Sequence, residues 1–383
     1  MKYDFVVVGA TGQQGLIASR DLLERGYRVL MCGRRPENLK PLLKNRGAGF
    51  ARVDLRDVAA AARVIGRSGS RIALNCAELR WNLHMMKACL RARSHYLDLG
   101  GLHEMTIRQY AQDRPWRAKK LLALLGCGST PGIANVMAAY AAERLDTVAR
   151  IDLGFAWDSN VKAFVLPYSL ESIVYELTVP AIVLENGRFK KIRGCRLEGP
   201  DEFLGVGQQV TRCIVHSEVY TFHKYFQGKG LRGVHYKAGF PAHSYKVLET
   251  LMQLGFTSGE PVAHQGRTMT ALEFTDRVLR RLPSPARYAE RENLWVKVRG
   301  TSDGRPKAVA MDCLVRTTPG WGDAGSNVGT GRTIAVMAVM LHRGEIAAVG
   351  VTAPEACVPA APFFRELEER GMRFYKNRRT LSV

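Results

Sequence analysis

Apolar and polar positions along the first third of the chain repeat in units of about twenty residues, each a short apolar run followed by a helical spacing. The runs are rich in β-branched residues and end in glycine or polar residues, which is typical of buried parallel strands. We predict strands at 3–8, 27–33, 49–55, 71–77, 94–101 and 118–126. Helices are predicted at 16–26, 36–45, 57–65 and 79–92. This alternation predicts an α/β, doubly wound Rossmann sheet with right-handed crossovers.

The pattern changes after residue 131. A helix is predicted at 133–145, and then period-two alternation predicts strands at 150–157, 189–195, 211–222, 233–240, 294–301 and 307–317. Helices are predicted between them at 169–177, 245–254 and 271–281. We therefore expect a second, α+β domain with a mixed or antiparallel sheet over residues 131–328.

The C-terminal part of the chain is predicted to form a helix at 331–342, a strand at 345–351 and a helix at 363–370. We expect it to return to the first domain. The Rossmann domain would then be discontinuous and consist of residues 1–130 and 329–383.

Length and composition fit this division. A chain of 383 residues exceeds one ordinary domain, and 46% apolar with 24% charged residues is normal for a folded protein. The sequence has no apolar run long enough to span a membrane, and no signal peptide is recognised at its start. The eight cysteines lack metal-ligand spacing, so we expect reduced core thiols, no metal and a cytoplasmic location.

The net charge of +21 arises from 56 Lys and Arg against 35 Asp and Glu. A surplus of this size attracts anionic partners. The basic residues are spread along the chain and form no basic tail, so an anionic cofactor is a better expectation than a nucleic acid.

A glycine motif follows the first predicted strand. The sequence GATGQQG at 9–15 places Gly9, Gly12 and Gly15 where the chain passes from strand to helix, with Thr11, Gln13 and Gln14 between them. In this context glycines allow a tight turn and close backbone approach to a pyrophosphate, which the helix N-terminus then binds. The motif predicts a nicotinamide-dinucleotide site.

The end of the second strand distinguishes the two forms of the cofactor. NAD sites place Asp or Glu there for the ribose hydroxyls, but this chain has Gly33 followed by Arg34 and Arg35. Guanidinium groups pair with a 2′-phosphate, so NADP is favoured over NAD. Further cofactor contacts are expected from residues at strand ends and in the link between the domains: Asp54, Asn75, Ala77, Gly128 and Pro131.

Several stretches carry a family likeness, and together they span almost the whole chain. The chain resembles the saccharopine dehydrogenase-like family in GATGQQG (9–15), HYLDLGG (95–101), GCGSTPGIANVMAAYAAERLD (126–146), PYSLESIVYELTVPAIVLENGR (167–188), IVHSEVYTF (214–222), YKAGFP (236–241) and the segment 329–359. The resemblance implies a split Rossmann domain, a second domain that often makes homodimer contacts, and redox chemistry at a C–N bond of an amino acid.

Hydride transfer from an amine requires a group that takes up a proton near neutral pH, and histidine is the usual one. His216, beside Glu218, is the first catalytic candidate, followed by Tyr168, Tyr220 and Lys237. Arg332 is a candidate for binding a substrate carboxylate in a bidentate manner. Asn135, Asp98 and Glu218 are candidates for substrate contact, and Asp98 is also a candidate for ordering the loop beside the nicotinamide.

The sequence thus predicts an NADP-dependent oxidoreductase that acts on a C–N bond of a saccharopine-, lysine- or carboxy-polyamine-like substrate through an imine. Two alternatives stay open. One is a carbonyl reductase of the extended short-chain type, suggested by the YxxxK spacing of Tyr220 and Lys224, although that pair falls about 70 residues late and in a segment predicted as strand. The other is a non-catalytic NADP(H)-binding redox sensor that binds a partner through its positive charge.

Overall fold

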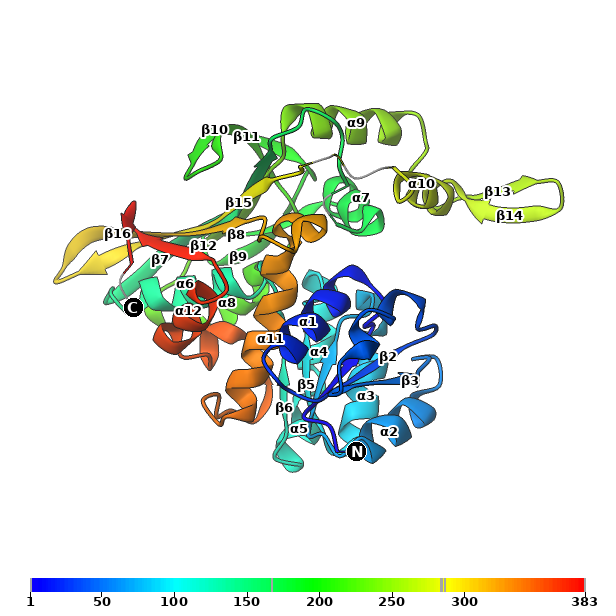
Figure 1. The fold of residues 1–383 in the computed structure, drawn as a ribbon. Coiled ribbons are helices and arrows are strands. Elements are labelled where there is room, and N and C mark those ends of the chain that lie inside the picture. The colour runs from blue at the N-terminus through cyan, green and yellow to red at the C-terminus, as the bar shows by residue number, and fades with distance from the viewer. Residues whose placement is uncertain (1, 167, 283–284, 286, 382–383) are drawn as a thin grey trace.

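The first half of the molecule is organised around a parallel sheet. The computed structural model describes residues 2–166, 168–282, 285 and 287–381 (Figure 1). Within these residues the sheet has seven strands, in the order β17 (Gly350–Thr352), β6 (Leu122–Leu124), β5 (His95–Asp98), β4 (Ile72–Asn75), β1 (Phe5–Val8), β2 (Val29–Gly33) and β3 (Ala48–Arg52). The strand order reverses at β1, which pairs in parallel with both β2 and β4. Open α/β sheets bind ligands in the crevice at such a switch point.

Helices cover both faces of the parallel sheet. The helices α1 (Gln13–Glu24) and α11 (Val328–His342) pack together on one face. On the other face the apolar side chains come from α2 (Val58–Arg67), α3 (Asn82–Ala92), α4 (His103–Tyr110) and α5 (Asp113–Ala118). The Rossmann architecture predicted from the alternation is confirmed.

The second sheet is mixed and larger. Among the described residues it has ten strands, with β7 (Thr147–Ser159) and β12 (Gly233–Gly239) paired in parallel near its centre and the other pairs antiparallel. The remaining strands are β8 (Ala181–Glu185), β9 (Arg188–Ile192), β10 (Arg196–Phe203), β11 (Gly207–Cys213), β15 (Glu290–Ser302), β16 (Arg305–Arg316), β18 (Arg373–Lys376) and β19 (Arg379–Thr380). The predicted second α+β unit with a mixed sheet is confirmed.

The helices of the second unit occupy different positions around its sheet. The helix α6 (Ile133–Ala142) packs on β7, β15 and β16, and α8 (Glu218–Phe226) packs on β12 (Figure 1). Buried apolar residues of α6 and α11 belong to one continuous core that reaches both sheets. The other helices are α7 (Leu170–Thr178), α9 (Ala242–Gln253), α10 (Ala271–Leu279) and α12 (Ala360–Glu368).

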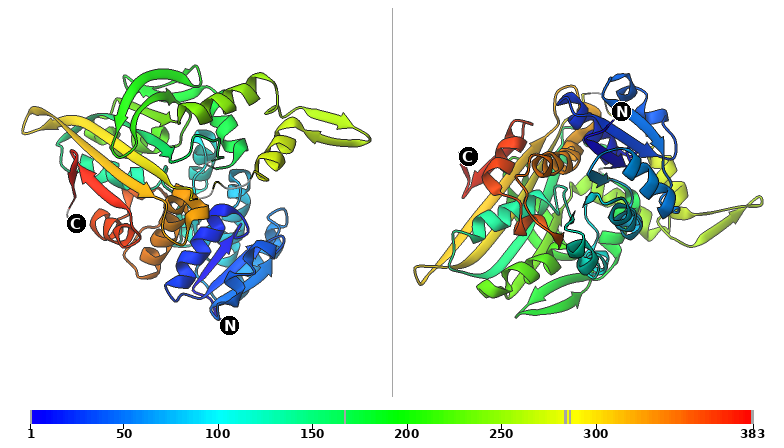
Figure 2. Two further views of the ribbon diagram at one scale, coloured as in Figure 1. Left: turned by 45° about the horizontal axis from the view of Figure 1, so that its top comes forward. Right: turned by 90° about the horizontal axis from the view of Figure 1, so that it is seen from below.

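Two hairpins extend from the body at opposite ends (Figures 1 and 2). One is the end of the long β15–β16 pair, and the other is formed by β13 (Pro261–His264) and β14 (Arg267–Thr270) beside α10. The segment from the end of α9 through α10, which we call the arm (residues 254–282), carries exposed apolar side chains. These are Leu254, Phe256, Val262, Phe274, Val278 and Leu282.

Two sequence predictions of secondary structure are wrong. Residues 36–45 form two short 3₁₀ helices, Glu37–Leu39 and Leu42–Lys44, because Pro41 lacks an N–H and would clash with the preceding turn of a continuous helix. The strand predicted at 211–222 ends at Cys213, and α8 begins at Glu218. Its buried Val219, Phe222 and Phe226 have helical spacing, which outweighs the apparent alternation.

The C-terminal region divides between the two sheets. As expected, α11 packs on α1, and β17 adds a parallel strand beside β6. However, β18 pairs with β16 and β19 pairs with β18, so the last strands extend the mixed sheet. The prediction places all of residues 329–383 with the Rossmann domain, whereas β18 and β19 belong to the mixed sheet. The correction has a simple cause: periodicity identifies a strand but not the partner with which it pairs.

The eight cysteines are free thiols. In the part of the chain that the structure describes, no helix is long and apolar enough to cross a membrane.

Candidate functional site

The glycine loop forms an open cradle at the N-terminus of α1. Gly9 has a φ of +81°, and a Cβ there would lie 2.5 Å from the backbone nitrogen of Ala77, so only glycine fits. A Cβ on Gly15 would lie 2.3 Å from the carbonyl oxygen of Gly9. Gly12 is the exposed N-cap residue, and no side chain caps the helix or places a carboxylate in its first turn. The first N–H groups of α1 are therefore available to an anion, and the loop fits a dinucleotide pyrophosphate.

The other candidate cofactor residues surround this cradle. Gly33 lies against Thr11, where a Cβ would come within 3.0 Å of the threonine methyl group. Arg34 and Arg35 are exposed just beyond β2. Of the two loop glutamines, Gln13 is exposed, while Gln14 donates a hydrogen bond to Asn327.

Asp54 and Asn75 already have protein partners. Asp54 forms a bidentate ion pair with Arg56, whose hydrogen bonds lower the pKa of that carboxyl to about 2. Asn75, at the end of β4, accepts a hydrogen bond from the backbone N–H of Ala77 at 3.2 Å and donates to Asn82. Asn75 therefore shapes the turn that approaches Gly9, and Asp54 faces Arg34, which also lowers its pKa.

Asp98 organises the loops at the carboxyl ends of β5 and β6. One carboxylate oxygen accepts from the backbone N–H groups of Gly100 and Gly126, and the other accepts from Tyr96 and Gln109. The ring of Pro131 packs against both glycines, and a Cβ on either would lie within 2.7 Å of it. These contacts fix Gly128 and Pro131 beside the crevice. Asp98 is fully enclosed, so it orders the loop rather than contacting a ligand.

Asn135 performs a related task at the start of α6. Its side-chain oxygen accepts from the backbone N–H of Gly132 at 2.8 Å, and its amide donates to Glu355 at 2.8 Å. Both ends of the side chain are thus occupied by protein, and Asn135 is buried.

His216 lies in the loop between β11 and α8, at the centre of a buried polar cluster. Its Nδ1 bonds the carboxylate of Glu218, the first residue of α8, and its ring stacks on Tyr236 with centroids 3.8 Å apart. Tyr236 donates a hydrogen bond of 2.7 Å to the hydroxyl of Thr130, the residue before Pro131. This bond connects the second sheet to the loop after β6, where Ser129 accepts a hydrogen bond from Thr330 of α11, the helix that packs on α1.

The electrostatic environment favours a protonated His216. Burial opposes the charged imidazole, but the charge and hydrogen bond of Glu218 outweigh it and raise the pKa of His216 above its ordinary value. Glu176 also contributes, and it accepts a hydrogen bond of 2.6 Å from Tyr168. Burial raises the pKa of the Glu176 carboxyl and brings that of Glu292 to about 8.

Three sequence candidates lie elsewhere. Lys237 follows Tyr236 on β12, and since successive side chains point to opposite faces, it lies 3.9 Å from both Glu198 and Asp201, away from His216. Arg332 lies within α11, not before it, and is buried. It bonds the carbonyl of Arg370 and the hydroxyl of Thr318 and lies near Asp21.

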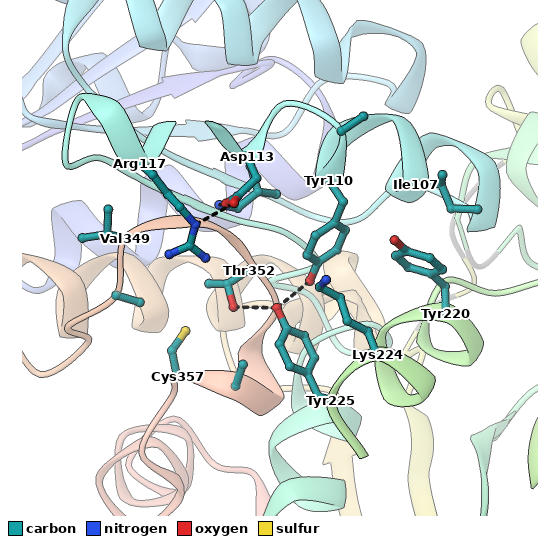
Figure 3. A pocket seen from close by; sticks show the side chains of 14 residues that line it. Ile107, Tyr110, Asp113, Arg117, Tyr220, Lys224, Tyr225, Val349, Thr352 and Cys357 are labelled. Carbon is teal, nitrogen blue, oxygen red and sulfur yellow. Dashed lines mark hydrogen bonds and ion pairs between the residues drawn. The ribbon is translucent and has the colours of Figure 1, made fainter. Parts of the chain in front are cut away.

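Tyr220 lies on α8, not on the strand predicted there, and packs against His103 and Tyr110. With Lys224 it lines a separate cavity of about 710 Å³ beside β17 (Figure 3). Tyr220 and Lys224 do lie on one helix, contrary to our prediction. That helix borders β17, which is an edge strand of the parallel sheet and is separated from β1 by β6, β5 and β4.

Sequence reasoning missed Tyr236, Thr130 and Glu176 as site residues. For Tyr236 a signal was available: strand alternation places Tyr236 and Lys237 on opposite faces, and the apolar neighbours of Tyr236 mark its face as the buried one. Nothing in the local sequence connects Thr130 or Glu176 to His216. Among the described residues, no cluster of three potential metal ligands is found.

Known proteins resemble this chain in sequence and in fold. Residues 128–372 match the family model for the saccharopine dehydrogenase C-terminal domain. The chain is 24% identical to carboxyaminopropylagmatine dehydrogenase of Synechocystis sp., covering 97% of this chain and 96% of that protein. It is 23% identical to carboxynorspermidine synthase of Vibrio alginolyticus, covering 76% and 73%, respectively. The fold matches saccharopine dehydrogenase (L-Glu forming) of Saccharomyces cerevisiae with a TM-score of 0.74 at 12% identity, over 99% of this chain and 100% of that one. The chain belongs to the saccharopine dehydrogenase family.

Proposed function

We propose that this protein is an NADP-dependent oxidoreductase acting on a C–N bond of an amino-acid or carboxy-polyamine-like substrate through an imine. The observation that carries the proposal is the His216–Glu218 pair, stacked on Tyr236, whose hydroxyl reaches Thr130 in the loop after β6. His216 is thus linked to the loop after β6, and that loop bonds α11, which packs on the helix α1 that follows the glycine cradle. The family and the names of the relatives support the same class of reaction.

The cofactor would be held by this chain's backbone and two arginines. The open N-terminus of α1 would bind the pyrophosphate, and Arg34 and Arg35 would bind the 2′-phosphate. When bound, the nicotinamide supplies a hydride acceptor or donor. The absence of a carboxylate at Gly33 favours NADP, because a carboxylate there would repel the phosphate.

His216 would accept the amine proton in oxidation and donate it in reduction. In the oxidative direction, a neutral amine gives up its N–H proton to Nε2 as the adjacent carbon loses hydride, while Glu218 on Nδ1 stabilises the imidazolium. In the reductive direction, the same nitrogen returns the proton. Tyr236 stacks on the imidazole of His216 and positions it. The hydrogen bond from Tyr236 to Thr130 fixes this pair relative to the loop that contains Thr130.

The substrate would carry positive charge close to the reacting carbon. Glu176 and Glu292 supply carboxyl groups around the site, and both influence the pKa of neighbouring tyrosines. Such groups suit an amine- or guanidine-bearing chain. The relatives are named for carboxyaminopropylagmatine and carboxynorspermidine, and we propose a substrate of that class.

We also propose a homodimer in which the arm contacts a second copy. Leu254 is 67% exposed, Val262 55% and Phe274 53%, a concentration of apolar surface that monomers rarely leave uncovered. Phe274→Asp is expected to convert a dimer into a monomer in sedimentation analysis. A monomeric parent protein would refute this part of the proposal.

The test of the function is a spectrophotometric screen at 340 nm, pairing NADP(H) and NAD(H) with saccharopine, lysine, carboxy-polyamines and aldehyde–amine mixtures. His216→Gln is expected to lower kcat about 100-fold or more while cofactor binding persists. His235→Gln is the matched control, because His235 is equally buried but lies beside Glu185. Failure of every pair to react, or full activity in His216→Gln, would refute the proposal. Loss of activity in Tyr220→Phe would instead favour the short-chain mechanism.

A further inference from the structure

His216 and Glu218 are almost completely enclosed by protein. His216 is 6% exposed and Glu218 0%. A reaction that releases or consumes a proton at Nε2 needs a path between the imidazole and water while substrate and cofactor fill the crevice. The structure contains a row of polar groups that begins at Glu218 and leads away from the crevice.

The row follows one side of α8. Glu218, Thr221 and Tyr225 are three and four residues apart, so their side chains project from the same face of the helix. That face is turned toward the short helix Pro354–Ala356 and the end of β17. The apolar residues of α8, which are Val219, Phe222 and Phe226, form a neighbouring stripe that packs against β12.

Glu355 lies opposite Thr221, on the short helix. It is buried and accepts a hydrogen bond from Asn135. Burial raises the pKa of its carboxyl to about 7, and the nearby Thr221 hydroxyl and the Asn135 amide oppose that shift. The titratable groups that face it are Glu218 and Tyr225 from α8, Tyr110 from α4 and Cys357 from its own segment.

Three oxygens along this row are buried and lack a hydrogen bond of ordinary geometry within the described part of the chain, although Thr221 lies close enough to Glu355 to lower its pKa. They are Glu218 Oε1, Thr221 Oγ1 and Glu355 Oε1. Buried polar atoms are normally satisfied, and water bridges them where protein groups do not. Their position in one row favours bridging water between the two carboxyl groups.

The outer end of the row is a hydrogen-bonded chain of hydroxyls that reaches the 710 Å³ cavity (Figure 3). Tyr225 bonds Thr352 at 2.9 Å and Tyr110 at 3.0 Å. Both tyrosines line the cavity, and their pKa values are raised by burial, with Glu355 adding to the shift. The hydroxyls therefore stay neutral, and each can accept one proton while donating another.

We propose that Glu218, Thr221, Glu355 and Tyr225 form a proton relay between His216 and the cavity beside β17, which gives it contact with solvent. The relay rests on the proposed function. In the oxidative direction the amine proton binds Nε2, the Nδ1 proton passes to Glu218, and one proton leaves through Thr221 and Glu355 for each hydride transferred. When the crevice opens, Nε2 releases its proton to water and Nδ1 takes a proton back through the same row, which restores the first tautomer. In reduction the same steps run in reverse.

The experiment compares Thr221→Val and Glu355→Gln with the parent enzyme in the direction that shows turnover. Each change is expected to lower kcat roughly tenfold or more while KM stays within about twofold, because proton release limits turnover. The solvent deuterium isotope effect on kcat should rise, and the isotope effect from deuterium on the transferred hydride should fall. Glu355→Gln should also remove the ionisation near pH 7 from the kcat profile. Tyr225→Phe, which keeps the ring, should give a smaller change in the same direction.

Thr250→Val on the exposed face of α9 is the matched control, since its hydroxyl only bonds the carbonyl of Lys246. It should leave both isotope effects unchanged. The relay is overturned if folded Thr221→Val and Glu355→Gln enzymes keep the parent kcat and solvent isotope effect, or if kcat falls with unchanged isotope effects. A parent protein without turnover on any substrate would refute the proposed function instead, so the two failures are distinguishable.

Discussion

Replacing Glu218 with glutamine tests the electrostatic role assigned to the His216 pair. The carboxylate bonds Nδ1 directly, and its charge raises the pKa of His216 against the effect of burial. Glutamine keeps the size of the side chain and a hydrogen-bonding oxygen but removes the charge. The substitution therefore changes the proton affinity of the imidazole with little change in packing.

The magnitude follows from the value of a hydrogen bond to a charged group. Such a bond contributes about 1.5–3 kcal/mol, and about 1.4 kcal/mol corresponds to one pKa unit. Glu218→Gln should therefore lower the pKa of His216, because the imidazolium loses a charged partner worth about 1.5–3 kcal/mol. Oxidation needs the neutral imidazole, so kcat/KM rises as pH rises through this pKa, and the variant should gain its activity at a correspondingly lower pH.

The assay is kcat/KM for the amine substrate between pH 5 and 10, followed at 340 nm. Glu185→Gln provides the control, because Glu185 lies 3.3 Å from the second buried histidine, His235, outside the site. The reasoning fails if the acidic limb stays at the same pH in Glu218→Gln, or if Glu185→Gln moves it equally. An upward shift would also contradict it, because loss of a negative charge cannot stabilise the imidazolium.

Three further predictions follow from contacts described above or from buried charges. Arg34→Ala and Arg35→Ala should each raise KM for NADPH about 10–100-fold and leave KM for NADH nearly unchanged, and equal changes for both cofactors would exclude a 2′-phosphate contact. Glu292→Gln should raise Tm more at pH 9 than at pH 5. Folding raises the pKa of the Glu292 carboxyl to about 8, so this carboxyl increasingly destabilises the folded protein as pH rises from its ordinary pKa toward 8. A pH-independent difference would contradict this. Arg370→Met should cost about 3–5 kcal/mol in urea unfolding, because it leaves Asp21 buried without its bidentate partner. A loss below about 1 kcal/mol would show that Arg332 and Arg25, which lie 3.6 and 3.8 Å from Asp21, compensate its charge.

Two arginine substitutions provide controls for these variants. Arg67→Ala removes an exposed arginine at the end of α2, at the opposite end of the parallel strands, and should leave both cofactor KM values unchanged. Arg343→Met removes a half-exposed partner of Glu366 and should cost less than about 1 kcal/mol.

The parallel sheet was predictable because its information is local. Each strand of the first unit is a short apolar run, and Gly9, Gly12 and Gly15 follow the first of them at the spacing that dinucleotide binding requires. His216 and Glu218 were identified because the chemistry names the residue types and the chain places them two apart. These features depend on neighbours in sequence.

The rest depends on contacts that sequence does not encode locally. Thr130 reaches Tyr236 across more than a hundred residues, and only strand register decides that Tyr236 rather than Lys237 faces the histidine. Arg332 has the side chain of a carboxylate-binding residue, but it lies within α11 and its guanidinium is buried by the surrounding protein. A motif gives the kind of side chain available, and tertiary packing decides what it contacts.

The division of the C-terminal segment between the two sheets has a consequence for the order of folding during synthesis. Strand β17, at residues 350–352, covers the edge of β6, which leaves the ribosome more than two hundred residues earlier. Strand β18 covers the edge of β16 later still. An uncovered strand edge readily pairs with other chains, and N-terminal units fold first as a chain emerges. The nascent protein must therefore carry two incomplete sheets until residues 350–376 are made, so its exposure to aggregation is set by how soon that segment is translated.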